Sequence, residues 1–349
     1  MKIAILAPPY LPIPPDGYGG VERIVYLLTE GLVKKGHDVT LFAPGDSKTS
    51  AKLSATFPKS IGNSGLDKSK SLSAVYPLIE YTDCFNRAGE FDLIHNHAEY
   101  YAMFLADFVK TPVVHTIHSS LSEGNVKAEK RATLKRFSSH NFVSISDSQR
   151  RPLPDINWVG TVYNGVNLEE FEFSPEKGNY LLWMGRITPK KGPVEAIEVS
   201  KKTGIPLKIV GVVDPADNTF FAEKIKPQID GKQIELLGEL HGRAQADLYK
   251  NALVTLYPIS WHEPFGLVMV ESMACGTPVV AFDIGSVPEI VENGRNGFAV
   301  KSVEEMVEAV GKIGNIKRED CRKSVEEKFT AERMVEGYEE VYKKVFRNS

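Results

Sequence analysis

The chain has few cysteines and no long apolar run, and both absences narrow the class of protein. Its 349 residues include three cysteines, Cys84, Cys275 and Cys321, which are odd in number and far apart. They predict neither a disulfide framework nor a zinc site, and they fit a reducing compartment. No apolar run reaches the ~18 residues of a membrane span, and the N-terminal MKIAILAPPY lacks the apolar length of a signal peptide. We therefore expect a cytoplasmic protein.

An excess of positive charge is also missing. The formal net charge is −3, with 42 Lys and Arg against 45 Asp and Glu, so no general affinity for nucleic acid is expected. Charged residues make up 25% and hydrophobic residues 42% of the chain, which is an ordinary balance for a soluble globular protein. At about 150 residues per domain, the length predicts two domains, each with its own core.

The first half of the chain alternates short apolar runs with longer amphipathic segments. The apolar runs are KIAILA, DVTLFA, FDLIHNH, PVVHTIH, NFVSIS and GTVYNG. Continuous β-branched runs of this kind are typical of parallel strands that are buried on both faces of a sheet. Helical patterns between them, such as residues 20–35, predict repeated βα units and hence an α/β fold.

A charged stretch with a proline and a glycine, NLEEFEFSPEKG at 167–178, interrupts this alternation and predicts a linker. The alternation then restarts with the strand-like runs YLLWMG, PLKIVG, QIELLG, LVTLYP and PVVAFD. We therefore predict two tandem Rossmann-like doubly wound domains, 1–170 and 171–330, with an amphipathic C-terminal helix in 331–349. Ligands of such sheets bind beyond the carboxyl ends of the strands, so the cleft between the domains is the expected site.

Residues 261–280, WHEPFGLVMVESMACGTPVV, place Glu263 and Glu271 on either side of Gly266. Apolar residues at helical spacing follow the glycine, so a helix is expected to begin there. The first turn of a helix attracts phosphate through its unpaired N–H groups, and a glycine lets the backbone approach a ligand closely. Carboxylates pair well with the vicinal hydroxyls of a ribose or a sugar. One interpretation is therefore a nucleotide-sugar site, and the other is a pair of solvated glutamates at a helix flank.

The segment HEPFGLVMVESMACGTPVVAFDIGSVPEIV resembles the signature of the retaining glycosyltransferases of family 4, in which seven residues separate two glutamates. Three further motifs resemble that family: the glycine loop GGVE at 19–22, the Asn-Gly turn YNGVN at 163–167, and the phosphate clamp GRITPKKG at 185–192. The resemblance extends over nearly the whole chain. It implies the GT-B fold, in which two Rossmann-like domains flank the active site and the last helix crosses back to the first domain.

The resemblance also assigns roles to matching residues. It implies that Glu271 binds the nucleotide ribose and that Glu263 contacts hydroxyls of the donor sugar. Arg186 and Lys191 match a basic pair on the diphosphate, where fixed cations stabilise the charge that develops on the leaving group. His118 matches a position near the donor sugar and is counted with Glu263, Arg186 and Lys191 as catalytic. The other expected donor contacts are Gly19, Gly20, Gly185, Phe265, Gly266, Leu267 and Val268.

Histidines near the predicted strand ends raise the question of a metal site. His95 and His97 share one face of a strand, but no cysteine or acidic partner motif accompanies them. No metal ligands are therefore predicted. His115 is expected to be buried within its strand.

A basic helical pattern lies in the first domain. Lys127, Arg131 and Lys135 follow one another at intervals of four residues within 127–136. We interpret this face as solvated, and a weak peripheral association with anionic lipid at the inner face of the membrane is the open alternative.

Together these observations predict a retaining, metal-independent hexosyltransferase without a cofactor. The expected donor is a nucleoside-diphosphate sugar, with a UDP-sugar favoured and GDP- or ADP-sugars open. The expected acceptor is a hydroxyl of a glycan, a glycolipid or a small molecule, bound by loops near 8–18, 45–70 and 119–128. A sugar-nucleotide epimerase or another non-transferase enzyme on the same fold is the alternative. An NAD-dependent oxidoreductase is disfavoured because GYGGVE lacks the G-x-G-x-x-G spacing.

Overall fold

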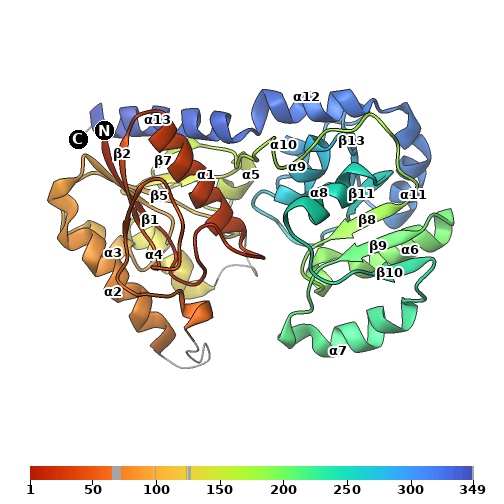
Figure 1. Ribbon diagram of the computed structural model, residues 1–349, viewed down its shortest axis with the longest axis horizontal. Coiled ribbons are helices and arrows are strands. Elements are labelled where there is room, and N and C mark those ends of the chain that lie inside the picture. Colours follow the sequence, from red (N-terminus) through yellow and green to blue (C-terminus); the bar gives the residue numbers. More distant parts are fainter. Residues whose placement is uncertain (65–71, 99, 123, 125–126, 348–349) are drawn as a thin grey trace. The chain divides into compact units, whose positions relative to one another are not determined.

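The computed structural model describes residues 1–64, 72–98, 100–122, 124 and 127–347 (Figure 1). Its internal contacts divide the chain into two compact units. Unit 1 comprises Met1–Gly165 together with Ala331–Ser349, and unit 2 comprises Val166–Thr330. The C-terminal segment therefore belongs to the same unit as the N-terminus, and unit 2 is an insertion between two segments of unit 1.

Unit 1 is built on a parallel sheet. Within the described residues the strand order is β3-β2-β1-β4-β5-β6-β7, and these neighbours pair in parallel. The central strand β1 is buried from Ile3 to Leu6, which is why the sequence shows a continuous apolar run there. The strands are β1 (Lys2–Leu6), β2 (Asp38–Phe42), β3 (Lys52–Ser54), β4 (Leu93–Asn96), β5 (Val113–Thr116), β6 (Asn141–Ser144) and β7 (Trp158–Thr161).

The helices of unit 1 include the C-terminal helix of the chain (Figure 1). That helix, α13 (Ala331–Arg347), buries residues at intervals of three and four, among them Tyr338 and Tyr342, and it packs against α1 and β7. Its amphipathic pattern therefore has a definite partner surface within unit 1. The other helices are α1 (Gly20–Lys34), α2 (Leu72–Asn86), α3 (Met103–Ala106), α4 (Ala128–Arg136) and α5 (Asp147–Arg150).

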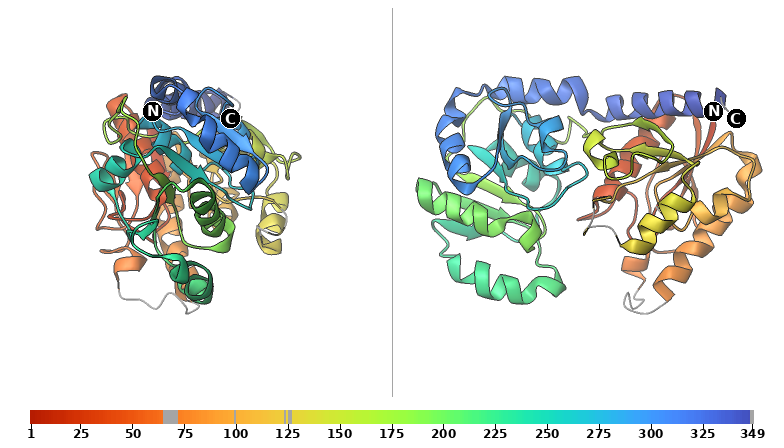
Figure 2. Two further views of the ribbon diagram at one scale, coloured as in Figure 1. Left: turned by 90° about the vertical axis from the view of Figure 1, so that its right-hand side faces the viewer. Right: turned by 180° about the vertical axis from the view of Figure 1, so that it is seen from behind.

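Unit 2 repeats this plan with the strand order β10-β9-β8-β11-β12-β13, again in parallel. Because the order reverses between β8 and β11, right-handed crossovers place helices on both faces of the sheet (Figure 2). The strands are β8 (Leu181–Met184), β9 (Leu207–Val210), β10 (Ile234–Leu236), β11 (Val254–Tyr257), β12 (Val279–Phe282) and β13 (Gly297–Val300). The helices are α6 (Pro193–Thr203), α7 (Asn218–Phe220), α8 (Gly242–Lys250), α9 (Leu267–Ala274), α10 (Val287–Ile290), α11 (Val303–Lys312) and α12 (Arg318–Lys328).

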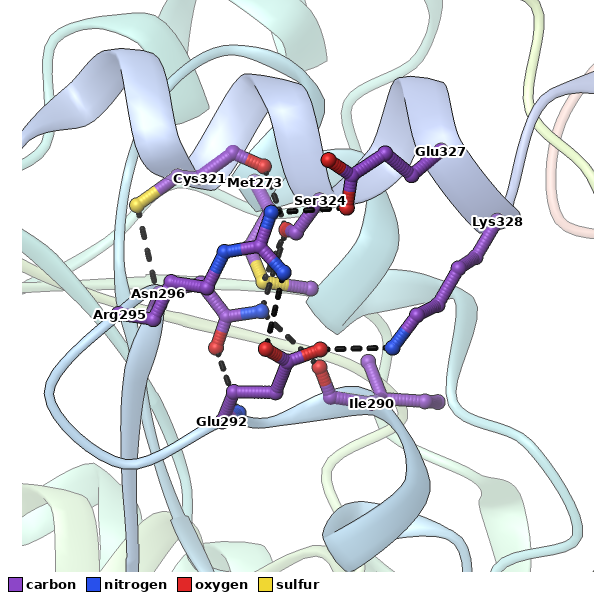
Figure 3. A network of polar contacts seen from close by, with 9 residues as sticks. All are labelled: Met273, Ile290, Glu292, Arg295, Asn296, Cys321, Ser324, Glu327 and Lys328. Carbon is purple, nitrogen blue, oxygen red and sulfur yellow. Dashed lines mark hydrogen bonds and ion pairs between the residues drawn. The ribbon is translucent and has the colours of Figure 1, made fainter.

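A polar network fastens α12 to the loop before β13 (Figure 3). The buried Asn296 side chain donates from Nδ2 to Ser324 Oγ at 3.1 Å. The Arg295 guanidinium bridges Glu292 at 2.9 Å and Glu327, on α12, at 2.8 Å. Since α12 also packs against α9, these contacts hold one flank of α9 in place.

Segment 167–178, which the sequence predicts to be a linker, contains no helix or strand but is packed into unit 2. The Phe171 side chain is buried, and the backbone N–H of Ser174 donates to the carbonyl of Cys275 at 3.2 Å. The buried Arg318 guanidinium donates to the Ser174 carbonyl at 2.7 Å. The segment is therefore an ordered part of unit 2.

The predicted α/β fold class with two tandem Rossmann-like sheets is confirmed. The strand-like runs named from the sequence overlap strands, although GTVYNG shares only Gly160 and Thr161 with β7, and β3 and β13 were not predicted. Both are edge strands, and the three-residue β3 is largely exposed. An edge strand is covered less completely than an interior strand, and the sequence of β3, KLS, accordingly lacks a continuous apolar run. The sequence of β13, GFAV, is apolar but only four residues long, and it was not recognised as a strand.

In the basic pattern at 127–136, Lys127 and Lys135 are exposed, as a solvated face requires, but Arg131 is half-buried. The Arg131 guanidinium donates to the carbonyls of Leu121 at 3.3 Å and Pro152 at 3.0 Å, so Arg131 ties α4 to its own unit. The Lys130 ammonium lies 4.5 Å from the centroid of the Tyr100 ring. None of the helices in the described part of the chain combines the length and the apolar composition that crossing a bilayer requires. Of the loops expected to contact the acceptor, residues 65–70, 123, 125 and 126 lie outside the described residues.

Candidate functional site

The residues singled out in unit 2 lie where its strand order reverses. Gly185 and Arg186 follow the carboxyl end of β8, and Lys191 ends the short 3-10 turn Pro189–Lys191. The neighbouring strand β11 leads into the segment that ends at Gly266, the cap of α9. The crevice beyond two such strand ends is the usual ligand position in an open α/β sheet.

Lys191 and Glu263 form an ion pair at this position. Lys191 Nζ lies 2.5 Å from Glu263 Oε2, and the Trp261 indole N–H donates to the same oxygen at 3.0 Å. The two charged side chains are only 18% and 15% exposed, so the pair is screened less than a surface pair. Gly192 allows the loop after β8 to approach the loop after β11, because a Cβ at this residue would lie 1.9 Å from the carbonyl oxygen of Pro258.

The start of α9 is shaped by a second glycine. Gly266 has φ +91°, and a Cβ at this residue would lie 2.7 Å from Met269 Cε and 2.9 Å from the Tyr257 hydroxyl. The Ser286 hydroxyl donates to the carbonyl of Phe265, which fixes the backbone just before the helix. The first N–H groups of α9 therefore have a defined direction, and they favour an anion at this end. The helix begins where the sequence predicts it.

Glu271 lies inside α9 and is 5% exposed. Its Oε2 accepts hydrogen bonds from Gln245 Nε2 and from the Tyr249 hydroxyl, both at 3.0 Å and both from α8. Burial, and after it the neighbouring Glu271 carboxylate, hold the pKa of the Tyr249 hydroxyl well above its ordinary value, so that Tyr249 stays a donor. These two donors fix the direction of the carboxylate and compensate part of its desolvation.

The remaining expected donor contacts of unit 2 differ in exposure. Arg186 is 44% exposed at its side chain and lies 3.5 Å from Asp214, so this ion pair is well solvated. Phe265 is buried and packs edge-on against Phe329, with 5.9 Å between the ring centroids. Only the backbone of Phe265 is therefore available to a ligand. Leu267 and Val268, the first residues of α9, are half-buried.

In unit 1 the strand order reverses between β1 and β4. Gly19 caps α1 and Gly20 is its first residue, downstream of β1. Glu22 in the first turn of α1 is buried, and burial raises the pKa of its carboxyl group. His97 and His118 follow the carboxyl ends of β4 and β5, so the expected residues of unit 1 also lie at the carboxyl edge of their sheet.

His118 is hydrogen-bonded to a second histidine. Its Nε2 lies 2.9 Å from His97 Nδ1, and the rings stack with 5.2 Å between centroids. Burial lowers the pKa of the His118 imidazole to about 4 and holds the pKa of His97 well below its ordinary value. Both rings are therefore neutral at pH 7, and His118 can exchange hydrogen bonds without carrying a charge.

His95 lies on β4 and His97 directly follows it, and 3.2 Å separates His95 Nδ1 from His97 Nε2. His115 is fully buried, as predicted, and its Nδ1 lies 2.9 Å from Asn96 Nδ2. Among the described residues, no group of three or more His, Cys, Asp or Glu side chains has the arrangement of a metal site.

Four residues of the unit 2 site were not singled out from the sequence. Trp261 shares a Glu263 oxygen with Lys191, Gln245 and Tyr249 hold Glu271, and Asp214 pairs with Arg186. Gln245 and Tyr249 stand four positions apart on α8, a spacing that places them on one helix face. This spacing could have indicated that the two side chains act together. The sequence does not show, however, that this face of α8 packs against α9.

Comparisons with known proteins agree with this geometry. A chain from Methanocaldococcus jannaschii, described as an uncharacterized glycosyltransferase, is 27% identical over 345 aligned positions, covering 86% of this chain and 85% of that one. The sucrose-phosphate synthase structure from Thermosynechococcus elongatus superposes with a TM-score of 0.82 at 19% identity, covering 100% of both chains. The Anabaena protein HepE in complex with UDP-glucose superposes with a TM-score of 0.76 at 18% identity, covering 99% of this chain and 100% of that one.

Two family models match the chain. The model for glycosyl transferases group 1 matches residues 167–328, and the model for glycosyltransferase family 4 matches residues 18–170. The first therefore falls on the unit that holds Lys191, Glu263 and Glu271, and the second falls on the unit that holds His118. Because the two models together extend from residue 18 to residue 328, the chain belongs to the glycosyltransferases of group 1 and family 4, with the two Rossmann-like sheets of the GT-B fold.

Proposed function

We propose that this glycosyltransferase moves a hexose from a nucleoside-diphosphate sugar, most favourably a UDP-sugar, to an acceptor hydroxyl with retention of the anomeric configuration. The observation that carries the proposal is the Lys191–Glu263 ion pair beside the start of α9. It combines a cation for a phosphate, a carboxylate for sugar hydroxyls and a helix N-terminus that favours an anion.

In this proposal the diphosphate binds at the start of α9. Lys191 and Arg186 supply the positive charge, and the backbone from Gly266 to Val268 supplies N–H donors. The Arg186–Asp214 pair is exposed and 3.5 Å long, so exchanging Asp214 for a phosphate oxygen costs little. The proposed transfer uses Lys191 and Arg186, and no metal ion, as its source of positive charge. HepE, which has the same fold, is a protein in complex with UDP-glucose, and this likeness supports a UDP-sugar as the first donor to test.

Glu271 is proposed to accept hydrogen bonds from the nucleotide ribose. Gln245 and Tyr249 both donate to Oε2, so they fix the plane of the carboxylate group. A buried carboxylate with a fixed direction discriminates a vicinal diol from other groups, because a missing hydroxyl leaves its oxygen incompletely satisfied.

Glu263 is proposed to position the donor sugar, because one of its oxygens already accepts from both Lys191 and Trp261. In the proposed step the bond between the anomeric carbon and the phosphate oxygen breaks. The acceptor oxygen bonds to the same carbon from the same face, and its proton passes to the departing phosphate. Lys191 and Arg186 stabilise the negative charge that develops on that phosphate.

Residues of unit 1 complete the proposal. His118 is proposed to exchange a hydrogen bond with a sugar hydroxyl. The start of α1 at Gly19 and Gly20, where the helix dipole is positive, is proposed to contribute to phosphate binding. The acceptor is a hydroxyl of a glycan, a lipid-linked sugar or a small molecule.

The test is a panel of UDP-, GDP- and ADP-hexoses incubated with simple glycoside acceptors, read by nucleotide release and by NMR of the product. We expect nucleotide release that depends on an acceptor, and an α-linked product from an α-configured donor. Epimerised donor without nucleotide release would indicate the epimerase alternative. A β-linked product would overturn retention. Glu263→Gln is expected to keep measurable turnover, since an amide still accepts a hydrogen bond, whereas a glycosyl ester trapped on Glu263 would show that it is a nucleophile.

A further inference from the structure

A chain of hydrogen bonds leads from His118 to the C-terminal helix. His118 Nε2 lies 2.9 Å from His97 Nδ1, and His97 Nε2 lies 3.2 Å from His95 Nδ1. The same His95 Nδ1 lies 2.6 Å from the Tyr342 hydroxyl of α13, and His95 Nε2 lies 2.7 Å from Thr116 Oγ1. The chain thus connects residue 118 to residue 342 entirely through side-chain atoms.

At the end of this hydrogen-bond chain near the C-terminal helix, the donor and acceptor roles can be assigned. The Thr116 hydroxyl donates to the Tyr338 hydroxyl at 3.2 Å, so Thr116 Oγ1 is left to accept from His95. His95 Nε2 then carries the proton, and His95 Nδ1 holds the lone pair. A phenol is a better donor than acceptor, and the short 2.6 Å contact fits donation from the Tyr342 hydroxyl to that lone pair.

This direction passes from ring to ring, because each neutral imidazole has one donor nitrogen and one acceptor nitrogen. The lone pair of His95 Nδ1 is shared between the Tyr342 hydroxyl at 2.6 Å and His97 Nε2 at 3.2 Å, so His97 Nε2 is a donor in the longer contact and His97 Nδ1 is an acceptor. His118 then donates from Nε2, and its Nδ1 is left with the lone pair. Burial holds the pKa values of all three rings below their ordinary value, which keeps each ring neutral and the alternation intact at pH 7.

We propose that Thr116 and Tyr342 set the tautomer of His118 through His95 and His97, so that His118 presents Nδ1 as a hydrogen-bond acceptor. All four are positioning residues, because the proposal gives contact with the ligand to His118 alone. The C-terminal helix then has a role beyond packing. Its Tyr342 hydroxyl helps to decide which nitrogen of the His118 ring accepts a hydrogen bond.

The consequence for specificity rests on the proposed function. An acceptor nitrogen on His118 selects a ligand group that can donate a hydrogen bond, such as a sugar hydroxyl, and rejects an analogue in which that hydroxyl is replaced by fluorine or by a methyl ether. The reverse tautomer would make His118 Nδ1 a donor and would lose this discrimination.

The test is long-range ¹H–¹⁵N NMR of the full chain with ¹⁵N-labelled histidine, which reports which ring nitrogen carries the proton. The His118 signals are assigned by their loss in His118→Gln. We expect wild-type His118, His97 and His95 to be protonated on Nε2. Loss of one hydrogen bond shifts such an equilibrium by about fivefold, so Tyr342→Phe and Thr116→Val should each move His118 measurably toward the Nδ1-protonated form.

Two controls separate a positioning role from a general loss of stability. Thr116→Ser keeps the hydroxyl and should keep the wild-type tautomer. Tyr180→Phe removes a phenol of unit 2 that donates to the Leu248 carbonyl at 2.7 Å, and it should leave all three rings unchanged. If Thr116→Val does not fold, Tyr342→Phe alone decides the outcome.

A wild-type His118 protonated on Nδ1, or a His118 tautomer that is the same in wild type and both variants, would overturn the proposal. Because the NMR measurement needs neither donor nor acceptor, its outcome is independent of whether the proposed transfer reaction is correct. If the transfer reaction is observed, Tyr342→Phe should also lower the discrimination between UDP-glucose and its fluorinated analogues.

Discussion

At the strand ends of unit 2 the side chains carry full charges, whereas at the strand ends of unit 1 they are neutral rings. Lys191 and Glu263 follow β8 and β11 and pair at 2.5 Å. His97 and His118 follow β4 and β5 and lie 2.9 Å apart, with pKa values that burial holds low. The two sheets have the same order around their central strands, so the fold alone does not produce this difference.

The same order of parallel strands can therefore support two kinds of chemistry. A reversal of strand order provides an edge where side chains and ligand meet, and the residues placed there decide which ligand groups are favoured. Paired charges of unit 2 suit an anionic diphosphate, which can exchange with a carboxylate. Neutral, linked imidazoles of unit 1 suit hydroxyl groups, which need direction more than charge.

The largest expected effect that follows from this contrast is selective acid unfolding of unit 1. His95, His97, His115 and His118 all have lowered pKa values in the folded state, with that of His118 at about 4 and that of His115 at about 3. Below pH ~6.5 the unfolded chain binds more protons than the native chain, so the free energy of unfolding falls as the pH falls. Each histidine contributes up to about 1.4 kcal/mol per pH unit in that window.

Hydrogen exchange with mass spectrometry at pH 7 and pH 5, corrected for intrinsic rates, measures this effect. Peptides of unit 1 should lose protection at pH 5, while peptides of unit 2 should keep it. His115→Gln should reduce the pH slope of unit 1, and His241→Gln should not, because His241 is a partly exposed residue of unit 2. Equal loss of protection in both units would show that the buried histidines do not make unit 1 more sensitive to acid than unit 2.

A smaller effect, on turnover, is expected for Lys191→Ala. Removing one fixed donor from the charge that develops on a leaving group costs on the order of 10²–10³ in rate. The neighbouring Lys190→Ala is the matched control, since Lys190 is exposed and its side chain has no role in the proposed site. Steady-state rates with the active donor of the panel measure the effect. A rate for Lys191→Ala within about threefold of the wild-type rate would remove Lys191 from the mechanism.

The smallest of the three effects concerns a carboxyl group that unit 1 buries without a cation. Glu80 on α2 is fully buried, neither of its oxygens has a hydrogen-bonding partner among the described residues, and burial raises its pKa from 4.5 to about 8. The pKa of Glu80 is higher in the folded chain than in the unfolded chain. Its burial therefore lowers the free energy of unfolding by an amount that is absent below pH ~4.5 and grows as the pH rises toward 8. Glu80→Gln should therefore stabilise the protein by about 2–3 kcal/mol at pH 7.

Urea unfolding at pH 5 and pH 7.5 tests this, with the exposed Glu129→Gln as a control that should change stability by less than about 0.5 kcal/mol. The gain from Glu80→Gln should be larger at pH 7.5. A loss of stability at both pH values would show that Glu80 has a structural role that its burial alone does not reveal.

Much of the unit 2 site was predictable from the sequence, because its geometry is local. Gly266 with the apolar spacing after it predicts the start of α9, and the helix begins at Leu267. Glu263 and Glu271 are then placed by their distance along the chain from that start. The roles assigned to them, to Arg186 and to Lys191 remain predictions.

The partners of these residues were not predictable, because they come from distant elements. Glu271 meets Gln245 and Tyr249 only after α8 packs against α9. His95 meets Tyr342 across a separation of 247 residues. Periodicity shows that each segment has a buried face, but it does not show which polar groups share that face. The same limit explains Arg131, whose helical spacing suggested a solvated face and whose guanidinium binds backbone carbonyls of its own unit.

The division of unit 1 into two segments has a consequence for the order of events on the ribosome. Its final helix, α13, follows unit 2 in the chain, so the sheet of unit 1 is synthesised long before the helix that supplies Tyr338 and Tyr342. Unit 2 needs no residue beyond Thr330, and it can complete its own core while unit 1 still lacks one of its helices. The first unit to be translated is therefore the last to be finished. The contacts that close it join residues as far apart as Lys35 and Glu339, and contacts between residues so distant in the sequence form slowly.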